Sequence, residues 1–322
     1  MSLRSIPGST ASCAFLLLAL LPVSLQASNP SEQYEKGVKL EGAGRYSDAM
    51  ALLLKAAEKG IALAQHEVGR LYRGGLGVTK DNVEAVKWFR MAANQGLAEA
   101  QESVGESYFF GWGVQKDKLE ALKWFRLAAD QKLPEAEENV GMSYFYGWGV
   151  KQDYTAARKW FRLAADQGHA RSQNEMGRLY LAGSGVPRDY AEALKWFRMA
   201  ADQGLGEAQN NVGAFYFNGW GVPKNNAEAL KWFRKAAYQG IAQAQNDVGV
   251  FYSNGWGVVK DDAEALKFFR MAAEQGLPQA ESNVGWSYEN GIGVNKDQTE
   301  AMRWYRKAAD QGLIVASSNP KL

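Results

Sequence analysis

The side chains of this sequence that stand out as capable of chemistry are acidic, aromatic and amide groups between residues 99 and 246. One group consists of Glu99, Glu102, Glu106, Phe109, Phe110, Glu135, Glu138, Met142, Phe145 and Tyr146, and a second consists of Asn174, Asn210 and Asn246. Aromatic residues beside a few polar groups are typical of binding hot spots, and side-chain amides can bond the backbone of a bound peptide. These residues predict a surface that binds a protein or peptide.

Catalytic, metal and cofactor chemistry have little support. Asp and Glu are plentiful, but mostly at expected helix caps and surface positions, so no pair is distinguishable as general acid and base. His66 and His169 are isolated and have no metal-spaced neighbour. The recurring Gly-x-Gly motif lacks the third glycine and the preceding strand of a phosphate loop. We therefore predict no catalytic residue, no metal site and no cofactor.

The elements that must position these residues are copies of one segment. Asp81–Gly96 reads DNVEAVKWFRMAANQG and returns as DKLEALKWFRLAADQK, DYTAARKWFRLAADQG and four further copies. With their upstream halves, these form seven uninterrupted 36-residue units from Ile61 to Gly312. Repeats with periods of about 20–50 residues stack, because one unit cannot bury its apolar face alone. Such stacks present extended surfaces, which favours a binding scaffold.

Each unit predicts two helices, numbered here so that Ile61 is position 1. Positions 4, 8, 9 and 12 (Ala, Val, Gly and Tyr) share one face of the first helix, which a Gly-x-Gly-Val turn ends. Glycine inside a helix costs about 1 kcal/mol, so the invariant Gly at position 9 must serve close packing. Asp81 and Glu84 illustrate a capping box that would satisfy two backbone donors of the second helix.

The second helix has an apolar stripe at positions 25, 28, 29, 32 and 33. Residues shared by all copies belong to the stack, so we expect a tryptophan core at position 28, formed by Trp88, Trp124, Trp160, Trp196, Trp232 and Trp304. We expect the turn tryptophans to pack over their turns; they are Trp112, Trp148, Trp220 and Trp256. Gly at position 36 ends the helix, and Lys132 in its place should be slightly strained.

The pattern Ala-x-Ala-Gln, Val-Gly, Tyr, Gly-x-Gly-Val, Asp, Glu-Ala, Trp-Phe, Ala-Ala and Gly resembles the Sel-one-like repeat, a relative of the tetratricopeptide repeat. The resemblance covers Ile61–Gly312. It implies an all-α, right-handed superhelical solenoid of antiparallel helix pairs, whose first helices line the concave side. By the same analogy, the acidic, aromatic and asparagine groups fall at concave positions. The family implies an adaptor or assembly scaffold, in bacteria frequently exported.

Residues 1–27 differ from the rest and have the layout of a signal peptide. Arg4 is their only charge, the apolar run Cys13–Leu21 follows, and Ala27 ends the segment. A membrane anchor is the alternative, but a span needs about 20 apolar residues and Pro22 ends this run. We expect export to the periplasm or beyond, and no integral membrane segment after cleavage. Because Cys13 is the only cysteine, thiol chemistry is excluded from the mature chain.

Residues 28–60 predict a tetratricopeptide-like hairpin that caps the stack, with Gly37, Leu40 and Leu53 at the appropriate spacing. Residues 313–322 form a tail that begins an eighth unit without completing it, which indicates either a frayed end or a site for a partner.

The formal net charge of +2, with both signs interleaved in every unit, gives no reason to expect nucleic acid as a partner. The leading hypothesis is an exported, non-catalytic scaffold whose concave face binds a ligand with Lys or Arg next to apolar side chains. A carbohydrate or cell-wall binder is the alternative, since aromatics beside Glu and Asn also suit sugars. A third hypothesis comes from disulfide-rich relatives linked to β-lactams. This chain lacks their cysteine pairs.

Overall fold

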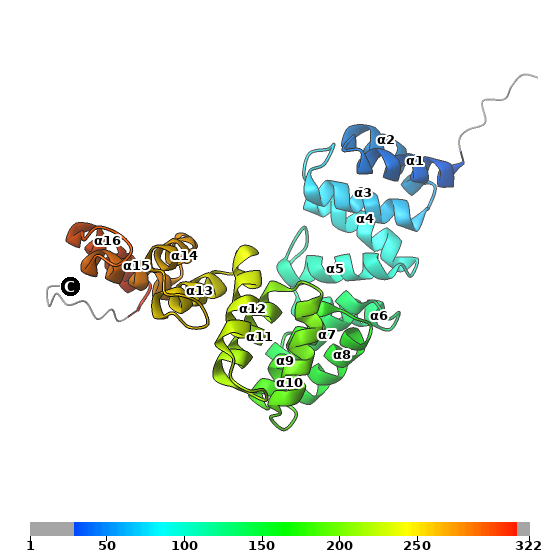
Figure 1. The fold of residues 1–322 in the computed structure, drawn as a ribbon. Helices are drawn as coiled ribbons and strands as arrows, with labels where there is room; N and C mark the ends of the chain where they lie inside the picture. The colour runs from blue at the N-terminus through cyan, green and yellow to red at the C-terminus, as the bar shows by residue number, and fades with distance from the viewer. Residues whose placement is uncertain (1–28, 314–322) are drawn as a thin grey trace, which may run out of the picture.

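The computed structural model describes residues 29–313, which form an all-α solenoid with no strand within that range. The helices are α1 (Pro30–Gly42), α2 (Tyr46–Glu58), α3 (Ala62–Gly74), α4 (Asn82–Asn94), α5 (Ala98–Phe110), α6 (Lys118–Ala129), α7 (Pro134–Tyr146), α8 (Tyr154–Asp166), α9 (Ala170–Ala182), α10 (Tyr190–Asp202), α11 (Gly206–Asn218), α12 (Asn226–Tyr238), α13 (Ala242–Asn254), α14 (Asp262–Glu274), α15 (Pro278–Asn290) and α16 (Gln298–Asp310). Consecutive helices pack in pairs, and each pair packs on the next, giving the curved array in Figure 1. The predicted fold class is confirmed.

A glycine and an aromatic ring hold the two helices of each unit together. In unit three, a Cβ added to Gly141 would lie 2.6 Å from ring carbons of Phe161. The same contact recurs as Gly69–Phe89, Gly105–Phe125, Gly177–Phe197, Gly213–Phe233, Gly249–Phe269 and Gly285–Tyr305. The invariant glycine therefore allows the close packing that was predicted, and its partner is the aromatic residue at position 29.

The prediction of a tryptophan core at position 28 is wrong in most copies. Only Trp196 and Trp232 are buried, whereas the other four tryptophans of that set are half-buried. Phe161 is fully buried, while its neighbour Trp160 is not. The physical reason is angular: adjacent helix positions point about 100° apart, so position 29 faces the first helix and position 28 lies at the edge of the stripe.

The second helices are capped by Asp or Asn as predicted, but only half of the capping box forms. Asp81 Oδ1 accepts hydrogen bonds from the backbone N–H groups of Val83 and Glu84, at 2.9 and 3.0 Å. The backbone N–H of Asp81 donates instead to the Tyr72 carbonyl of the first helix, at 3.0 Å. The Glu84 side chain is left to pair with Lys87, at 2.7 Å. The cap thus ties the two helices of a unit together.

Buried amides connect successive units. Gln101 Nε2 donates to the Ala93 carbonyl of the preceding unit at 3.3 Å, and Gln101 Oε1 accepts from Gln131 Nε2 of its own unit at 2.8 Å. Equivalent glutamines repeat this pattern in units one, four, five and six. In units three and seven the buried position is occupied by Glu137 and Glu281, which accept from the local glutamine.

The ends of the array have the expected local form where they are described. Helices α1 and α2 make a hairpin in which Leu53 is fully buried and contacts the position of Gly37.

Lys132, which ends unit two, has a φ of 65° and is the one non-glycine residue of 29–313 with positive φ, as its place at a helix end predicts. The predicted signal peptide, 1–27, and the tail beyond residue 313 lie outside the described residues. No helix within 29–313 is both long and apolar enough to cross a membrane.

Candidate binding site

A pocket between units two and three brings together five residues of the predicted acidic and aromatic group. It has a volume of about 380 Å³, and we call it the acidic–aromatic pocket. Its lining consists of Glu106, Phe109, Phe110, Phe125, Glu138, Asn139, Met142, Trp148 and Arg171. Helices α5, α6 and α7 supply most of these side chains, and Arg171 reaches it from α9. The pocket depends on the stacking of units, because no single unit contains its walls.

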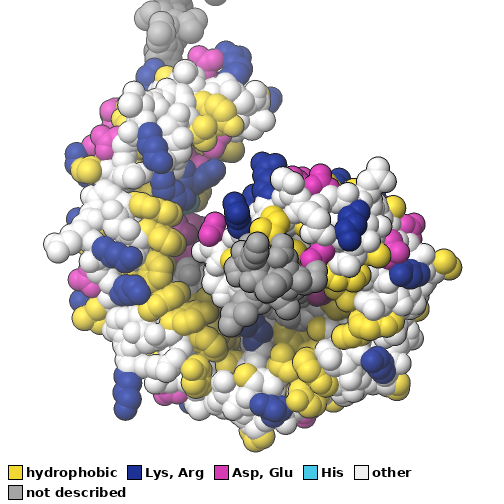
Figure 2. Space-filling model, turned by 90° about the vertical axis from the view of Figure 1, so that its left-hand side faces the viewer, with side chains coloured by type: hydrophobic (Ala, Val, Ile, Leu, Met, Phe, Trp, Pro, Cys, Tyr) yellow, Lys and Arg dark blue, Asp and Glu magenta, His cyan; other side chains and the backbone are white. Residues whose placement is uncertain are grey.

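Aromatic contacts shape one side of the pocket. The ring centroid of Phe109 lies 4.8 Å from that of Trp148, and Phe110 stacks on Trp112 at 4.4 Å. Tyr146 stacks on Trp148 at 4.6 Å. Phe110 lines the pocket and keeps 51% of its surface exposed, whereas Tyr146, which is 44% exposed, does not line it. Hydrophobic side chains also gather in bands between charged groups on the face drawn in Figure 2.

Two aromatic residues differ from their expected roles. Phe145 packs inside its own unit, with its ring 5.2 Å from Tyr154 and 6.4 Å from Phe161, and it does not line the pocket. Trp148 was assigned to turn packing, yet it forms a wall of the pocket. The turn of one unit lies beside the first helix of the preceding unit, and a pattern read within one unit does not show this contact. The contact of Trp148 with Phe109 of the preceding unit, which the sequence of one unit does not reveal, is what places Trp148 in the pocket.

The glutamates form a partly buried acidic surface. Burial, reinforced by Glu106 and Glu135, raises the pKa of Glu102 to about 7. Burial also raises the pKa of Glu138 to about 7, although Arg171 opposes the shift. A cation that approaches such a carboxyl group stabilises its ionised form. The arrangement therefore favours a positively charged group in the ligand.

The predicted glutamates differ in their exposure and in their contacts. Glu99 and Glu135 are exposed in the first turns of α5 and α7. Glu106 forms an ion pair with Arg73 of unit one, with 2.7 Å between Nη1 and Oε2. Asn139 Nδ2 donates to Glu102 Oε1 at 3.2 Å. These contacts hold the carboxylates of Glu106 and Glu102 in place on the scaffold before any ligand binds.

A second cavity of about 400 Å³ continues the surface toward unit four. It is lined by Glu138, Met142, Arg171, Asn174, Glu175, Arg178, Leu205 and Glu207. Arg178 pairs with Glu175 at 3.0 Å, and burial raises the pKa of Glu175. Acidic character thus extends beyond the two units in which it was predicted, but here it alternates with arginine.

The asparagine ladder does not form the open surface that was expected. Asn174 is 2% exposed and Asn246 is 6% exposed. Their side-chain oxygens accept hydrogen bonds from Asn211 and Asn283 of the following units, at 3.0 and 2.8 Å. Asn210 is half-buried. The expected exposure is therefore wrong for two of the three residues, because the position faces the next first helix. Asn174 also lines the second cavity.

Metal binding is not indicated in the described part of the chain. Among residues 29–313, no group of three or more His, Cys, Asp or Glu side chains is placed to hold a metal ion. His169 lies 3.9 Å from a Glu138 oxygen, and burial lowers its pKa. The site offers apolar contact, carboxylates and arginine to a ligand.

Comparisons with known proteins agree with this architecture. The family model described as Sel1 repeat matches residues 34–61, 62–97, 98–133, 134–169, 170–205, 206–241, 242–277 and 278–313. The first of these segments is the hairpin that we expected to be tetratricopeptide-like. No curated protein sequence matches the chain.

Two solved structures are similar over most of the chain. A protective antigen of uropathogenic Escherichia coli with an SLR fold is 35% identical, with a TM-score of 0.76; the similarity covers 88% of this chain and 62% of the antigen. A Sel1 repeat protein from Oxalobacter formigenes is 32% identical, with a TM-score of 0.69, over 89% of this chain and 86% of that one.

Proposed function

The chain belongs to the Sel1 repeat family, and from this premise we propose that it is an exported, non-catalytic scaffold that binds a protein or peptide segment through its acidic–aromatic pocket. Sel1 repeats commonly mediate interactions between proteins. We place the pocket on the concave side of the solenoid by analogy with tetratricopeptide helices. Export rests on the sequence of residues 1–27.

The observation that carries the proposal is the pairing of exposed rings with partly buried carboxylates in one cavity. Phe110 and Met142 supply apolar area, and Glu138 supplies negative charge beside it. A Lys or Arg side chain flanked by apolar residues would satisfy both walls at once. The rings should provide most of the binding free energy, while the carboxylates mainly increase the association rate and selectivity.

The test begins with capture of partners from an envelope extract of the native host on the immobilised chain, followed by surface plasmon resonance with the purified partner. Phe110→Ala combined with Met142→Ala should weaken binding at least about tenfold, chiefly by faster dissociation. Glu102→Lys combined with Glu138→Lys should slow association, and this loss should shrink as salt screens the charges.

Leu127→Ala is the matched control, since Leu127 is 47% exposed on α6 and lies outside the pocket. Equal binding by the wild type, the control and both double variants would reject the pocket as the site. A glycan array measured in parallel would support the carbohydrate alternative if sugars bound and the captured proteins did not. Hydrolysis of the chromogenic β-lactam nitrocefin would contradict the non-catalytic assignment.

A further inference from the structure

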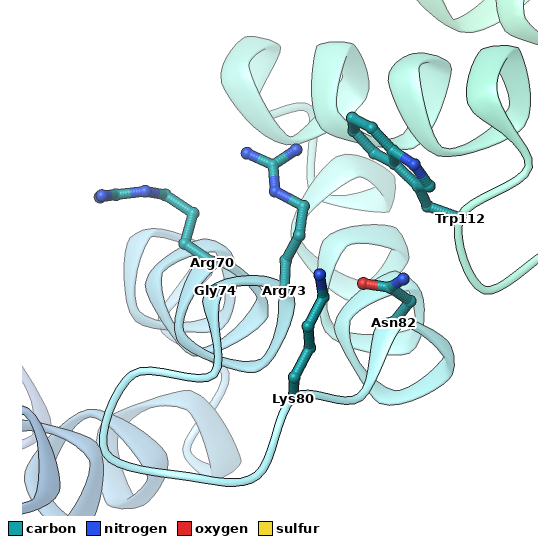
Figure 3. A pocket seen from close by; sticks show the side chains of 6 residues that line it. All are labelled: Arg70, Arg73, Gly74, Lys80, Asn82 and Trp112. Carbon is teal, nitrogen blue, oxygen red and sulfur yellow. The ribbon is translucent and has the colours of Figure 1, made fainter.

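A third pocket, with a basic lining, lies at unit one, and the contacts described so far do not explain it. It has a volume of about 510 Å³ and is lined by Arg70, Arg73, Gly74, Lys80, Asn82 and Trp112; we call it the cationic pocket. Figure 3 shows Arg73 and Lys80 extending into the same space, with Trp112 of the following unit on its far side. No carboxylate is part of its lining.

The cationic pocket differs from the acidic–aromatic pocket because unit one departs from unit two at two positions. In unit two, Phe109 and Phe110 occupy positions 13 and 14, and Phe109 packs against Trp148 of the next unit at 4.8 Å. In unit one, Arg73 and Gly74 replace this pair of rings. The guanidinium carbon of Arg73 lies 5.9 Å from the centroid of Trp112, and Gly74 contributes no side chain. Two substitutions thus exchange an aromatic wall for a charged one.

The cations of this pocket are not equally engaged. Glu106 pairs with Nη1 of Arg73 at 2.7 Å, and Arg70 pairs with Glu67 and, at 3.5 Å, with Glu41. Lys80, by contrast, makes no hydrogen bond or ion pair with any residue of 29–313, and its side chain is exposed. A cation that opens onto a cavity without a carboxylate in its lining is available to an anion. Trp112, with 37% of its surface exposed, adds an apolar wall.

We propose that the cationic pocket binds a carboxylate carried next to an apolar side chain on a polypeptide. Glu106 connects the pockets, because it lines the acidic–aromatic pocket and pairs with Arg73 of the cationic pocket. One extended segment can therefore place an acidic residue or its C-terminal carboxylate at unit one and a basic residue at units two and three. This orientation of the partner rests on the proposed function, whereas binding of the carboxylate itself does not.

The test uses N-acetyl-phenylalanine as the probe and the full chain labelled with ¹⁵N in its tryptophan indoles. The Trp112 resonance is assigned with Trp112→Phe. We expect N-acetyl-phenylalanine to shift this resonance saturably, and N-acetyl-phenylalanine amide, which has no charge, to leave it in place. N-acetyl-Phe-Glu-amide, whose only carboxylate is in the side chain, distinguishes an internal acidic residue from a free C-terminus. Binding of either carboxylate supports the site.

Two variants connect the shift to the pocket. Lys80→Met should weaken the probe about tenfold, because a charged hydrogen bond is lost. Lys116→Met is the matched control at the same position of unit two, outside the cationic pocket, and should not change the affinity. Arg73→Phe should abolish binding with little change in the unfolding midpoint, since phenylalanine occupies this position in units two, three and five.

Several outcomes would overturn the inference. They are equal shifts with the acid and its amide, equal effects of the two lysine variants, or tighter binding of phenyl phosphate than of N-acetyl-phenylalanine. In one further outcome, the probe fails to bind while Phe110→Ala with Met142→Ala still weakens binding of the partner. In that case the carboxylate site is refuted and the proposed function stands. If the probe binds and that double variant has no effect, the carboxylate site stands without the acidic–aromatic pocket.

Discussion

The ring of Phe161 lies directly against the backbone of Gly141, so closely that the added Cβ of any other residue would stand 2.6 Å from two ring carbons. This distance is well inside van der Waals contact, and the ring is itself fully buried. Neither partner has free space in which to move. The pair fixes the separation of α7 and α8, and through α7 it supports the acidic–aromatic pocket.

Gly141→Ala should destabilise the chain by about 1–3 kcal/mol, the usual range for overpacking a core. Gly42→Ala is the control, because a methyl group there meets nothing within 4 Å and φ is not positive. It should be neutral or stabilising by up to about 1 kcal/mol. Chemical denaturation followed by circular dichroism and tryptophan fluorescence measures both variants. A Gly141→Ala chain as stable as the wild type would show that the helices can separate at low cost.

Phe161→Ala should cost about 3–5 kcal/mol, since it empties a fully buried aromatic site. Trp160→Ala should cost less, because Trp160 is only half-buried. The same denaturation experiment ranks them, with agreement between the two probes as the check that unfolding occurs in one step. A larger loss of unfolding free energy for Trp160→Ala than for Phe161→Ala would show that position 28, and not position 29, forms the core.

The free energy of unfolding should fall as the pH rises from about 4.5 to about 7, because of two glutamates of the acidic surface. The pKa values of Glu102 and Glu138 are raised from 4.5 to about 7 by burial. Between these values the folded chain retains protons that the unfolded chain has released, so the unfolding free energy declines with increasing pH. Glu102→Gln with Glu138→Gln should flatten this decline. Denaturation at pH 5 and pH 8 compares the slopes, and parallel curves for variant and wild type would contradict the assignment.

Partner binding should have the opposite pH dependence. A Lys or Arg group in the acidic–aromatic pocket favours the ionised forms of Glu102 and Glu138, so affinity should rise between pH 6 and pH 8. The glutamine double variant should lose this increase. Surface plasmon resonance at the two pH values provides the measurement, and an unchanged pH dependence would show that these carboxylates do not contact the ligand.

Export predicts a processed N-terminus. The layout of Arg4, Cys13–Leu21 and Ala27 predicts cleavage after Ala27, so protein isolated from its native host should begin at or near Ser28. N-terminal sequencing of envelope and cytosolic fractions measures this directly. Recovery of an intact Met1 start on soluble cytosolic protein would contradict it.

The sequence predicted the repeat architecture well because period, turn glycines and N-caps are local signals. Contacts between units were harder to infer. Asp81 was correctly identified as a cap, but nothing local showed that its N–H would find the Tyr72 carbonyl instead of Glu84. The burial of Asn174 has the same origin: its partner, Asn211, is 37 residues away. A surface predicted from the sequence of one unit does not show which of its side chains the next unit buries.

The two interruptions in the glutamine series have a mechanical consequence. An ionised Glu137 or Glu281 has no proton with which to bond a carbonyl of the preceding unit, as Gln101 does for Ala93. Tension applied along the chain should therefore concentrate at the seams before units three and seven. The first seam runs through the acidic–aromatic pocket, whose walls come from units two and three. Pulling on the ends of the solenoid should therefore act on that pocket and on the seam before unit seven before it disturbs the other units.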